Sequence, residues 1–380
     1  MFAEERVFCQ PSWVMQSSTV RAAITHFGAQ MGPVHFDCDQ PRSLQPYHVS
    51  PWQCEKNWVP YGLPEKVLRG DFFCLPFGYA GPEAGMPSHG RTASGAWLFD
   101  YFRSLTGVHE LRIHMTNALR EAQVTRQFFL RDGENVVYDR TTISGLSGRH
   151  TLGHHAVLRL PHRQSSLLVS TSKQIFGMTY PEHLHSSEHP EHRSLALGSV
   201  FDDLTSVPSS NDSSNIDCSI HPVRRGFTDL LQIGIQTEKE EPAWTAAVNT
   251  EDGYLWFSLR DAALLPSTIF WIENEGRGHA PWNGRNRSLG LEDVCSFFDA
   301  GSNASAAPNA FSERGIRTVQ DFQANIPLSV AYIQGAVRTP QGFGKVHTVR
   351  CESNRVSFTD SNGKVVSANV AAGFLFGVDL

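Results

Sequence analysis

Residues 124–138 read VTRQFFLRDGENVVY, and this stretch predicts a β-hairpin. The segment 124–130 is rich in branched and aromatic residues, and 135–138 follows as a second short strand. The turn Arg131-Asp132-Gly133 lies between them, and an Asp-Gly turn flanked by such runs is typical of a hairpin. The pattern of short strand, turn and short strand is the one that the rest of the chain repeats.

Short strand-like segments separated by glycine and proline continue along the sequence. The chain contains 31 glycines and 21 prolines, scattered over its whole length, and the segments between them are short and rich in Val, Ile, Phe, Thr and Ser. Sustained helical periodicity is rare. Further strands are predicted at 155–160, 166–170, 230–235, 254–259, 267–272, 326–334 and 356–359. The sequence therefore predicts an all-β protein with many strands.

No compositional break behaves like an interdomain linker, so residues 1–380 are predicted to form a single β-sandwich domain. Residues 180–219 are polar and are predicted to form a long surface loop between strands. The segment carries spaced histidines, at His183, His185, His189 and His192. No Cys or acid accompanies them at a recognisable ligand spacing, so no metal site is predicted there.

The composition of the chain indicates which classes of partner are disfavoured. Hydrophobic residues make up 40% of the 380 residues, which is enough for a large buried core. Lys and Arg number 32 against 38 Asp and Glu, a formal net charge of −6, and no basic block stands out. Nucleic acid and anionic membrane surfaces are therefore disfavoured as partners.

Several features favour a soluble, cytoplasmic protein. No apolar run approaches the roughly 20 residues needed to cross a bilayer, and the start MFAEERVFCQ lacks the plan of a secretory leader. The seven cysteines are an odd number without any CxxC pair. Reduced thiols are the expectation for such a chain.

The first stretch that could carry chemistry is 69–78, followed by Ser88-His89-Gly90 and Trp97. It combines a cation at Arg69, an imidazole at His89 and aromatic rings such as Phe77. Such a mixture suits a sugar, because rings stack on C–H faces while charged groups bind hydroxyls. The alternative is a buried strand and a turn whose His binds a backbone carbonyl.

The second stretch is 153–161, which contains His154 and His155. Adjacent residues on a strand point to opposite faces, so one imidazole can reach a cleft while the other faces away. Only one of the two is expected to act. The same geometry disfavours a paired-histidine metal site.

The third stretch runs from 270 to 293 and is dense in the residue types that line polyol-binding clefts, among them Trp271, Trp282 and Arg285. Glu292 follows the apolar frame Leu-Gly-Leu. A partly desolvated carboxylate is more basic and suits proton abstraction. The alternative is a structural acid paired with Arg285 or Arg287. The motifs GxGxxG, GxxxxGK[ST], HExxH and GxSxG are absent from the sequence, so the chemistries they serve lack support.

Together these stretches resemble the galactose-mutarotase-like superfamily, which contains the aldose 1-epimerases and the hexose-6-phosphate 1-epimerases. The matching segments are 69–78, 87–90 with Trp97, 153–160 and 289–292, and they occur in the family's order. The resemblance implies a large β-supersandwich of antiparallel sheets whose concave face holds a monosaccharide or oligosaccharide. It implies no metal and no organic cofactor.

The resemblance also implies roles. Glu292 would be the general base that takes the proton of the anomeric hydroxyl, and His155 the general acid that protonates the ring oxygen, on the opposite side of the hemiacetal. His89 matches a second imidazole that holds the ring or a nearby hydroxyl. The residues expected to bind the sugar are Arg69, Phe77, Trp97, Asp229, Trp271, Trp282 and Arg285.

Two departures from the family pattern limit the substrate. The phosphate-sugar epimerases carry an Arg three residues after the Gly of Ser-His-Gly, where this chain has Ala93 and a displaced Arg91. This argues against a sugar phosphate. The Asn-Arg pair that grips the sugar in galactose mutarotases is also not apparent before His89, although Arg69 could substitute.

Two other functions therefore stay open. One is a carbohydrate-binding or sensing protein that has kept the fold and lost turnover. The other is polysaccharide lyase or hydrolase chemistry, which needs a second acid or a Tyr at the site. Glu273 or Glu275 could serve if either lies near Glu292. Neither the particular sugar nor the oligomeric state is predicted.

Overall fold

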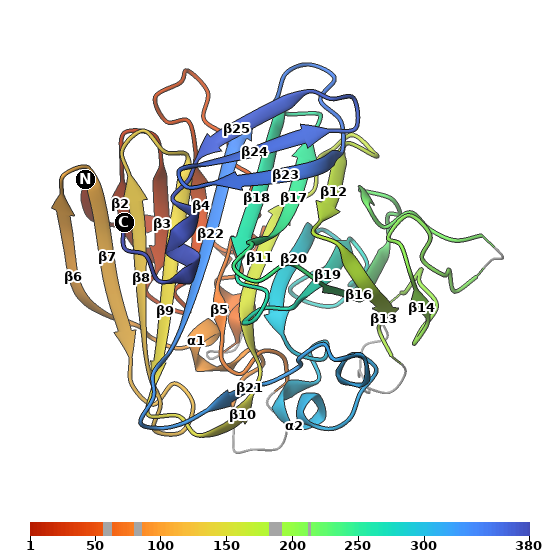
Figure 1. The fold of residues 1–380 in the computed structure, drawn as a ribbon, viewed down its shortest axis with the longest axis horizontal. Coiled ribbons are helices and arrows are strands. Elements are labelled where there is room, and N and C mark those ends of the chain that lie inside the picture. The colour runs from red at the N-terminus through yellow and green to blue at the C-terminus, as the bar shows by residue number, and fades with distance from the viewer. Residues whose placement is uncertain (56–62, 80–85, 182–191, 212–213) are drawn as a thin grey trace.

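The computed structural model describes residues 1–55, 63–79, 86–181, 192–211 and 214–380. Within these ranges the strands form five sheets, and every pairing of named strands is antiparallel (Figure 1). The prediction of an all-β, antiparallel architecture is confirmed.

The two largest sheets have nine and seven strands. In spatial order the nine-stranded sheet contains β15 (Ile220–His221), β12 (Leu167–Thr171), β17 (Ala243–Asn249), β18 (Tyr254–Arg260), β22 (Leu328–Arg338), β9 (Val136–Ser144), β8 (Gln123–Arg131), β7 (Val108–Met115) and β6 (Leu98–Leu105). The seven-stranded sheet contains β14 (Val200–Phe201), β13 (Gln174–Thr179), β16 (Phe227–Ile235), β19 (Ser267–Asn274), β20 (Arg287–Cys295), β11 (Leu152–Arg159) and β5 (Phe73–Cys74).

Smaller elements surround these sheets. The four-stranded sheet consists of β1 (Phe2–Val7), β2 (Gln10–Gln16), β3 (Arg21–Thr25) and β4 (Met31–His35). The remaining pairs are β10 (Gly148–His150) with β21 (Gln320–Phe322), and the sheet of β23 (Val346–Glu352), β24 (Arg355–Asp360) and β25 (Val365–Asn369). The helical turns are α1 (Gly90–Ser94), α2 (Gly301–Ala306), η1 (Pro64–Lys66), η2 (Ser312–Arg314) and η3 (Ala372–Phe376). In the described part of the chain, no helix is long and apolar enough to cross a membrane.

The predicted strands are confirmed. The hairpin forms as β8 and β9, in which Phe129 lies opposite Tyr138. The other predicted segments fall on β11, β12, β16, β18, β19, β22 and β24. Several strands were not predicted, among them β1–β4, β6, β7, β13, β17, β23 and β25. Strands such as β1, with the sequence FAEERV, lack a clean alternation of apolar and polar residues, so their pattern carries little strand signal.

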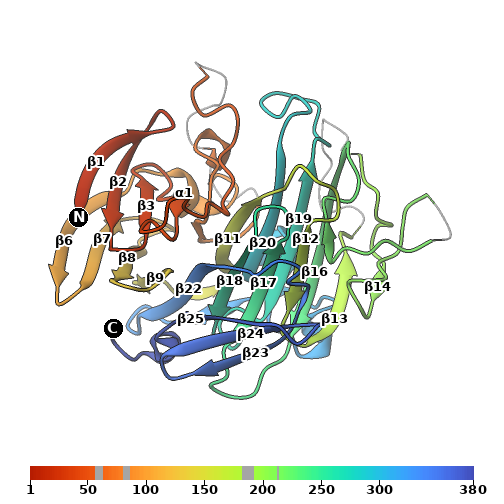
Figure 2. The same cartoon turned by 90° about the horizontal axis from the view of Figure 1, so that it is seen from above.

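The two large sheets pack face to face around the core (Figure 2). Tyr332 on β22 shows the contact, because its ring stacks on His154 of β11 at 4.0 Å and its hydroxyl donates to Asp293 Oδ2 of β20 at 2.6 Å. Asp293 also forms an ion pair with Arg260 of β18 at 2.9 Å, and both side chains are fully buried. A polar network thus joins the sheets inside an otherwise apolar core.

The prediction that all thiols are reduced is wrong for one pair. Cys9 and Cys54 form a disulfide, with their Cα atoms 5.3 Å apart. The turn between β1 and β2 places Phe8 and Cys9 in the left-handed region, with φ of 46° and 62°, and Cys9 meets the segment that follows Ser50. The sequence separation of 45 residues hides this pairing, because it depends on how the four-stranded sheet docks.

The segment 180–219 is more ordered than a polar surface loop implies. His183, His185 and His189 lie outside the described residues. The described part contains β14 and a bridge between Val207 and Ile216, and it buries Leu195, Val207 and Cys218. Its apolar residues are too sparse to suggest a strand from the sequence, yet they anchor the segment against the seven-stranded sheet.

Candidate functional site

The central feature of the site is a row of side chains across three neighbouring strands. His155 on β11 lies directly opposite Glu292 on β20, which in turn lies opposite Ile269 on β19. Directly opposed residues of an antiparallel pair share one face of the sheet. The side chains of His155 and Glu292 therefore meet, with Nε2 and Oε1 3.2 Å apart.

These residues open into a cavity of about 650 Å³, a volume typical of small-molecule sites. The cavity lies over the seven-stranded sheet and draws on residues from distant segments. Its lining consists of Pro64, Glu65, Leu68, Phe72, Ser88, His89, His155, Tyr180, Arg193, Leu197, Thr228, Leu230, Ile269, Trp271, Arg277, Trp282, Glu292 and Asp299. The structure therefore brings together the three residues predicted to carry the chemistry, His89, His155 and Glu292.

His89, the residue that directly precedes α1, lines the cavity. Its φ of 61° is a left-handed conformation, and its ring lies edge-on to that of His155 at 5.0 Å. The backbone N–H of Gly78 donates to Nδ1 at 3.3 Å, so the ring proton of a neutral His89 belongs on Nε2. Burial lowers the pKa of His89 to about 4. His89 is thus a neutral hydrogen-bond donor at physiological pH.

The contact between Glu292 and His155 couples their protonation. Burial raises the pKa of Glu292 well above its usual value, and the negative charge of Asp299 adds to the effect. Burial lowers the pKa of His155, and the neighbouring His89 lowers it further. Both shifts favour a pair that holds one proton between its two members. The acid and the base therefore lie side by side, whereas the sequence analysis placed them on opposite sides of the hemiacetal.

Aromatic side chains form the walls around this pair. Phe72 stacks on the His155 ring at 4.4 Å, and Trp271 meets the same ring edge-on at 5.7 Å. Trp282 lies edge-on to Trp271 at 5.7 Å, and the Arg277 guanidinium lies 4.7 Å from the centroid of the Trp282 ring. Flat apolar faces beside hydrogen-bonding groups are what a sugar ring requires.

Arg69 and Trp97 lie away from the described cavity lining. The Arg69 guanidinium is fully buried, where it donates to the backbone carbonyls of Val67 and Val7 and to Gln53 Oε1. Trp97 is also buried and donates from Nε1 to the Thr92 carbonyl. Both residues hold the fold together, so Arg69 does not replace the missing sugar-gripping pair.

Phe77, Asp229 and Arg285 are not among the residues that line the cavity, and each makes other contacts. Phe77 packs edge-on against His89 at 4.9 Å. Asp229 accepts hydrogen bonds from the Ser194 and Leu195 backbone N–H groups and from the Ser194 hydroxyl, so its oxygens are already used. Arg285 forms an exposed bidentate pair with Glu55 at 2.5 and 2.9 Å.

Several cavity-lining residues were missed by the sequence analysis, among them Arg277, Asp299, Tyr180 and Arg193. Arg277 and Asp299 come from loops that follow β19 and β20, and Tyr180 and Arg193 come from the segment 180–219. The Arg193 guanidinium lies 4.5 Å from the centroid of the Tyr180 ring. Arg277 lies in the aromatic-rich stretch that begins at residue 270, and this stretch was the only sequence signal that pointed to any of these four residues. The others carry no local pattern.

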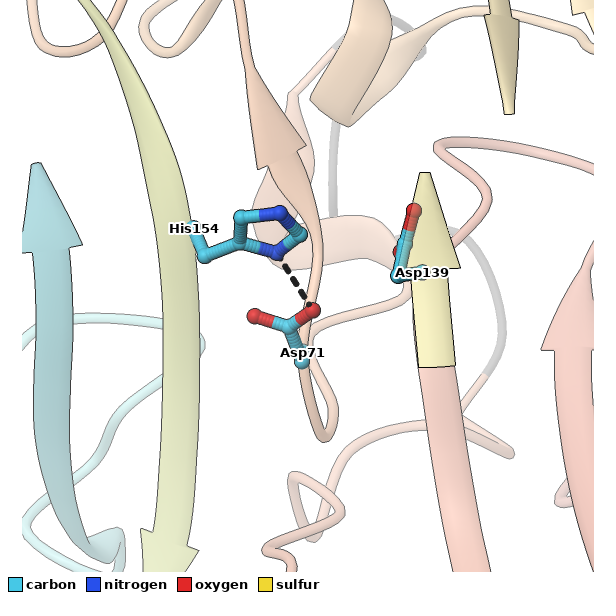
Figure 3. A group of neighbouring side chains, drawn as sticks. All are labelled: Asp71, Asp139 and His154. Carbon is cyan, nitrogen blue, oxygen red and sulfur yellow. Dashed lines mark hydrogen bonds and ion pairs between the residues drawn. The ribbon is translucent and has the colours of Figure 1, made fainter. Parts of the chain in front are cut away.

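His154 faces away from the cavity, as strand alternation predicts. Figure 3 shows it with Asp71 and Asp139 in the space between the sheets, where its Nδ1 lies 2.9 Å from Asp71 Oδ2. All three side chains are buried, and their ligand atoms lie within 4.8 Å of one another. The Arg126 guanidinium already pairs with Asp139 and lies 3.8 Å from Asp71. The carboxylate charge is therefore compensated by a protein cation, as expected for a structural network.

Gly290 sets the position of the Glu292 carboxyl group. A Cβ at Gly290 would meet Glu292 Oε1 at 2.6 Å and Trp271 Cβ at 3.0 Å. We expect Gly290→Ala to displace the carboxyl group and lower kcat/KM about 10-fold or more, because misplacing a reacting group by about 1 Å can cost 100-fold. Gly278→Ala is the matched control, since a Cβ there meets nothing within 4 Å. Equal rates for the two variants would contradict this positioning role.

No protein-family model matches the chain, and no curated protein sequence matches it significantly. A galactose mutarotase-like protein from Clostridium acetobutylicum superimposes with a TM-score of 0.58 at 10% identity, covering 89% of this chain and 99% of that one. A candidate mutarotase from Salmonella typhimurium superimposes with a TM-score of 0.58 at 10% identity, and the match covers 89% of this chain and 94% of that one. A candidate aldose 1-epimerase from Escherichia coli K12 superimposes with a TM-score of 0.55 at 11% identity, and the match covers 86% of this chain and 99% of that one.

Proposed function

We propose that this chain, which has the galactose mutarotase-like fold, interconverts the anomers of a sugar by acid–base catalysis. The fold confirms the resemblance predicted from the sequence. The observation that carries the proposal is the 3.2 Å contact between Glu292 and His155 inside a cavity walled by tryptophans. Fold alone does not establish activity, so the proposal stands on this pair and on His89.

In the proposed reaction Glu292 takes the proton of the anomeric hydroxyl while a proton reaches the ring oxygen. The C1–O5 bond then breaks and leaves an open-chain aldehyde, in which rotation about C1–C2 presents the other carbonyl face. Ring closure reverses both proton transfers, so no proton is gained or lost overall. His155 donates to the ring oxygen when it carries the shared proton, and His89 Nε2–H stabilises the oxygen by hydrogen bonding.

The shared proton explains how a dry site can hold both an acid and a base. With one proton on the pair, transfer across the Glu292–His155 contact converts carboxylic acid and imidazole into carboxylate and imidazolium. The second form is the one that the reaction uses. Spontaneous mutarotation already responds to acids and bases, so each positioned group supplies about 10²–10⁴-fold.

The same pair predicts the pH dependence. Below the lowered pKa of His155 both groups are protonated and the base is lost, whereas above the raised pKa of Glu292 both are deprotonated and the acid is lost. We expect a bell-shaped profile of kcat/KM whose acid limb lies below pH 6.5, the ordinary pKa of His. Polarimetry over a pH series, corrected for the buffer rate, measures it. A rise in rate only as the pH falls would contradict the assignment.

Hydrolase or lyase chemistry is the second candidate, on one observation. Asp299 and Tyr180 line the cavity together with Glu292, so it contains a second acid and a Tyr. Glu273 and Glu275 do not provide that acid, because Glu273 accepts hydrogen bonds from Thr228 and from the Gly276 N–H, and Glu275 pairs with Arg225. Release of new reducing ends or unsaturated sugars from oligosaccharides would favour this candidate.

The test of the proposed function is polarimetry of freshly dissolved α-glucose, α-galactose and other aldoses, with and without the protein. The expected result is faster mutarotation of at least one sugar. Calorimetric binding of a sugar without acceleration would instead select a carbohydrate-binding protein, and neither binding nor acceleration would refute both. A cytoplasmic location stays a prediction, against which the Cys9–Cys54 disulfide argues.

A further inference from the structure

The strand β6 ends the nine-stranded sheet and forms an outer rim of the molecule (Figure 1). It pairs with β7 on one side, and among the described residues its other edge has no backbone partner. With eight residues it is the longest of the strands that end the three largest sheets. An open edge of this length is a template for another strand.

Besides the charged Asp100 and Arg103, the strand β6 exposes three large apolar side chains. Leu98 is 54% exposed, Phe99 42% and Leu105 73%. The comparable edge strand β1 exposes Glu4 and Glu5, and charged side chains are the usual means of preventing edge-to-edge pairing. The apolar exposure on β6 is therefore a feature that needs a partner.

The register with β7 assigns each β6 side chain to a face. Phe99 lies opposite Ile113 and Phe102 opposite Leu111, so both phenylalanines share the inner face with two core residues. A bulge leaves Asp100 unpaired in the register. The outer face then carries Leu98, Asp100, Tyr101, Arg103 and Leu105, as the contacts of Asp100 with Arg112 and of Arg103 with Glu110 indicate.

We propose that β6 pairs antiparallel with β6 of a second copy of this chain, about a two-fold axis at Phe102, and so forms a homodimer with a continuous sheet. The bulge makes this register self-consistent, because omitting Asp100 leaves Phe102 at the centre of seven positions. Every opposed pair then shares a face: Phe102 with the partner's Phe102, Tyr101 with the partner's Arg103, Phe99 with the partner's Ser104, and Leu98 with the partner's Leu105.

Charge complementarity favours a second copy over an unrelated strand. Asp100 and Arg103 are the charged residues of β6, and they have opposite signs and share the outer face. Antiparallel pairing brings the Arg103 of each copy beside the Asp100 of the other, whereas a parallel pair in register would place like charges together. The Arg103 side chain is 66% exposed, so it has room for this second contact.

The first test measures mass in solution by sedimentation or light scattering on the full chain. We expect a dimer for the native sequence. Leu98→Lys combined with Leu105→Lys places like charges opposite each other twice, and we expect the dissociation constant to rise about 100-fold. Leu98→Lys combined with Leu105→Glu makes the same positions complementary and is expected to restore the dimer. Val365→Lys is the matched control, because Val365 is 56% exposed on β25.

The second test locates the axis. Phe102→Cys is expected to give a disulfide-linked dimer under mild oxidation, since opposed Cα atoms about 4.5–5.5 Å apart fit a disulfide. Ser104→Cys should not cross-link, because the two copies of residue 104 would lie about 14 Å apart along the strands. A monomeric native chain overturns the proposal. A dimer that survives both lysines and does not cross-link at position 102 overturns it as well.

Discussion

Glu292→Gln is expected to lower kcat for mutarotation by about 10²–10⁴-fold, the range that a positioned general base supplies. Gln has nearly the same shape and keeps the strand β20 intact, but it cannot accept the hydroxyl proton. The residual rate should be that of a cavity that still binds the sugar, so KM is expected to change little. Polarimetry on the best substrate of the panel measures both constants.

Glu275→Gln is the matched control for this experiment. Glu275 is the glutamate that directly precedes Glu292 in the sequence, and its carboxylate pairs with Arg225. Its substitution should leave the rate within about twofold, since surface ion pairs contribute little. Equal rates for native protein and Glu292→Gln on every sugar would remove Glu292 from the mechanism. Loss of activity in Glu275→Gln would favour a second acid.

The same variant carries an opposite prediction for stability. Burial raises the pKa of Glu292, so the folded state favours its neutral form. The stability that this provides is fully present below the ordinary pKa of 4.5 and is lost as the pH rises through the raised value. We therefore expect Tm of Glu292→Gln to exceed that of the native chain at alkaline pH, with a smaller difference in acid.

Asp293→Ala, one residue further along β20, is expected to destabilise the fold by about 3–5 kcal/mol. Asp293 points to the other face, where it pairs with Arg260 at 2.9 Å and accepts hydrogen bonds from Ser258 at 2.7 Å and Tyr332 at 2.6 Å. Removing the carboxylate leaves a fully buried guanidinium without its counter-charge. Urea denaturation followed by fluorescence measures the change in the free energy of unfolding.

Asp321→Ala provides the comparison for that measurement. Asp321 pairs with Arg149 at 3.6 Å, but its side chain is 79% exposed. Solvent screens this pair, so its loss should cost no more than about 1 kcal/mol. If Asp293→Ala unfolds at the same urea concentration as Asp321→Ala, the buried network does not stabilise the joined sheets in the proposed way.

The contrast between positions 292 and 293 shows what strand alternation allows a sequence to predict. Neighbouring residues on a strand face opposite sides, so only one of His154 and His155 could be expected to reach a cleft, and the family resemblance indicated His155. The Asp-Gly turn at 132–133 and the flanking apolar runs likewise predicted the β8–β9 hairpin. Both signals are local, and local signals survive in a single sequence.

Arg69 shows where this reasoning fails. A guanidinium next to a motif resembling a sugar site is equally compatible with binding a ligand and with binding backbone carbonyls. The docking of the first hairpin against 67–69 decides the matter, because it surrounds Arg69 with the carbonyls of Val7 and Val67. The same docking brings Cys9 to Cys54 and corrects the expectation of reduced thiols.

The sequence by itself therefore determined the all-β class, the strands with clear turns and the identity of His89, His155 and Glu292 as candidates. Only the tertiary structure decided that β11 lies beside β20 in the register that puts His155 against Glu292, and that Arg193, Arg277 and Asp299 reach the same cavity. The physical reason is one of range. Side-chain alternation is set within a few residues, whereas strand register and loop placement depend on packing between segments far apart in the chain.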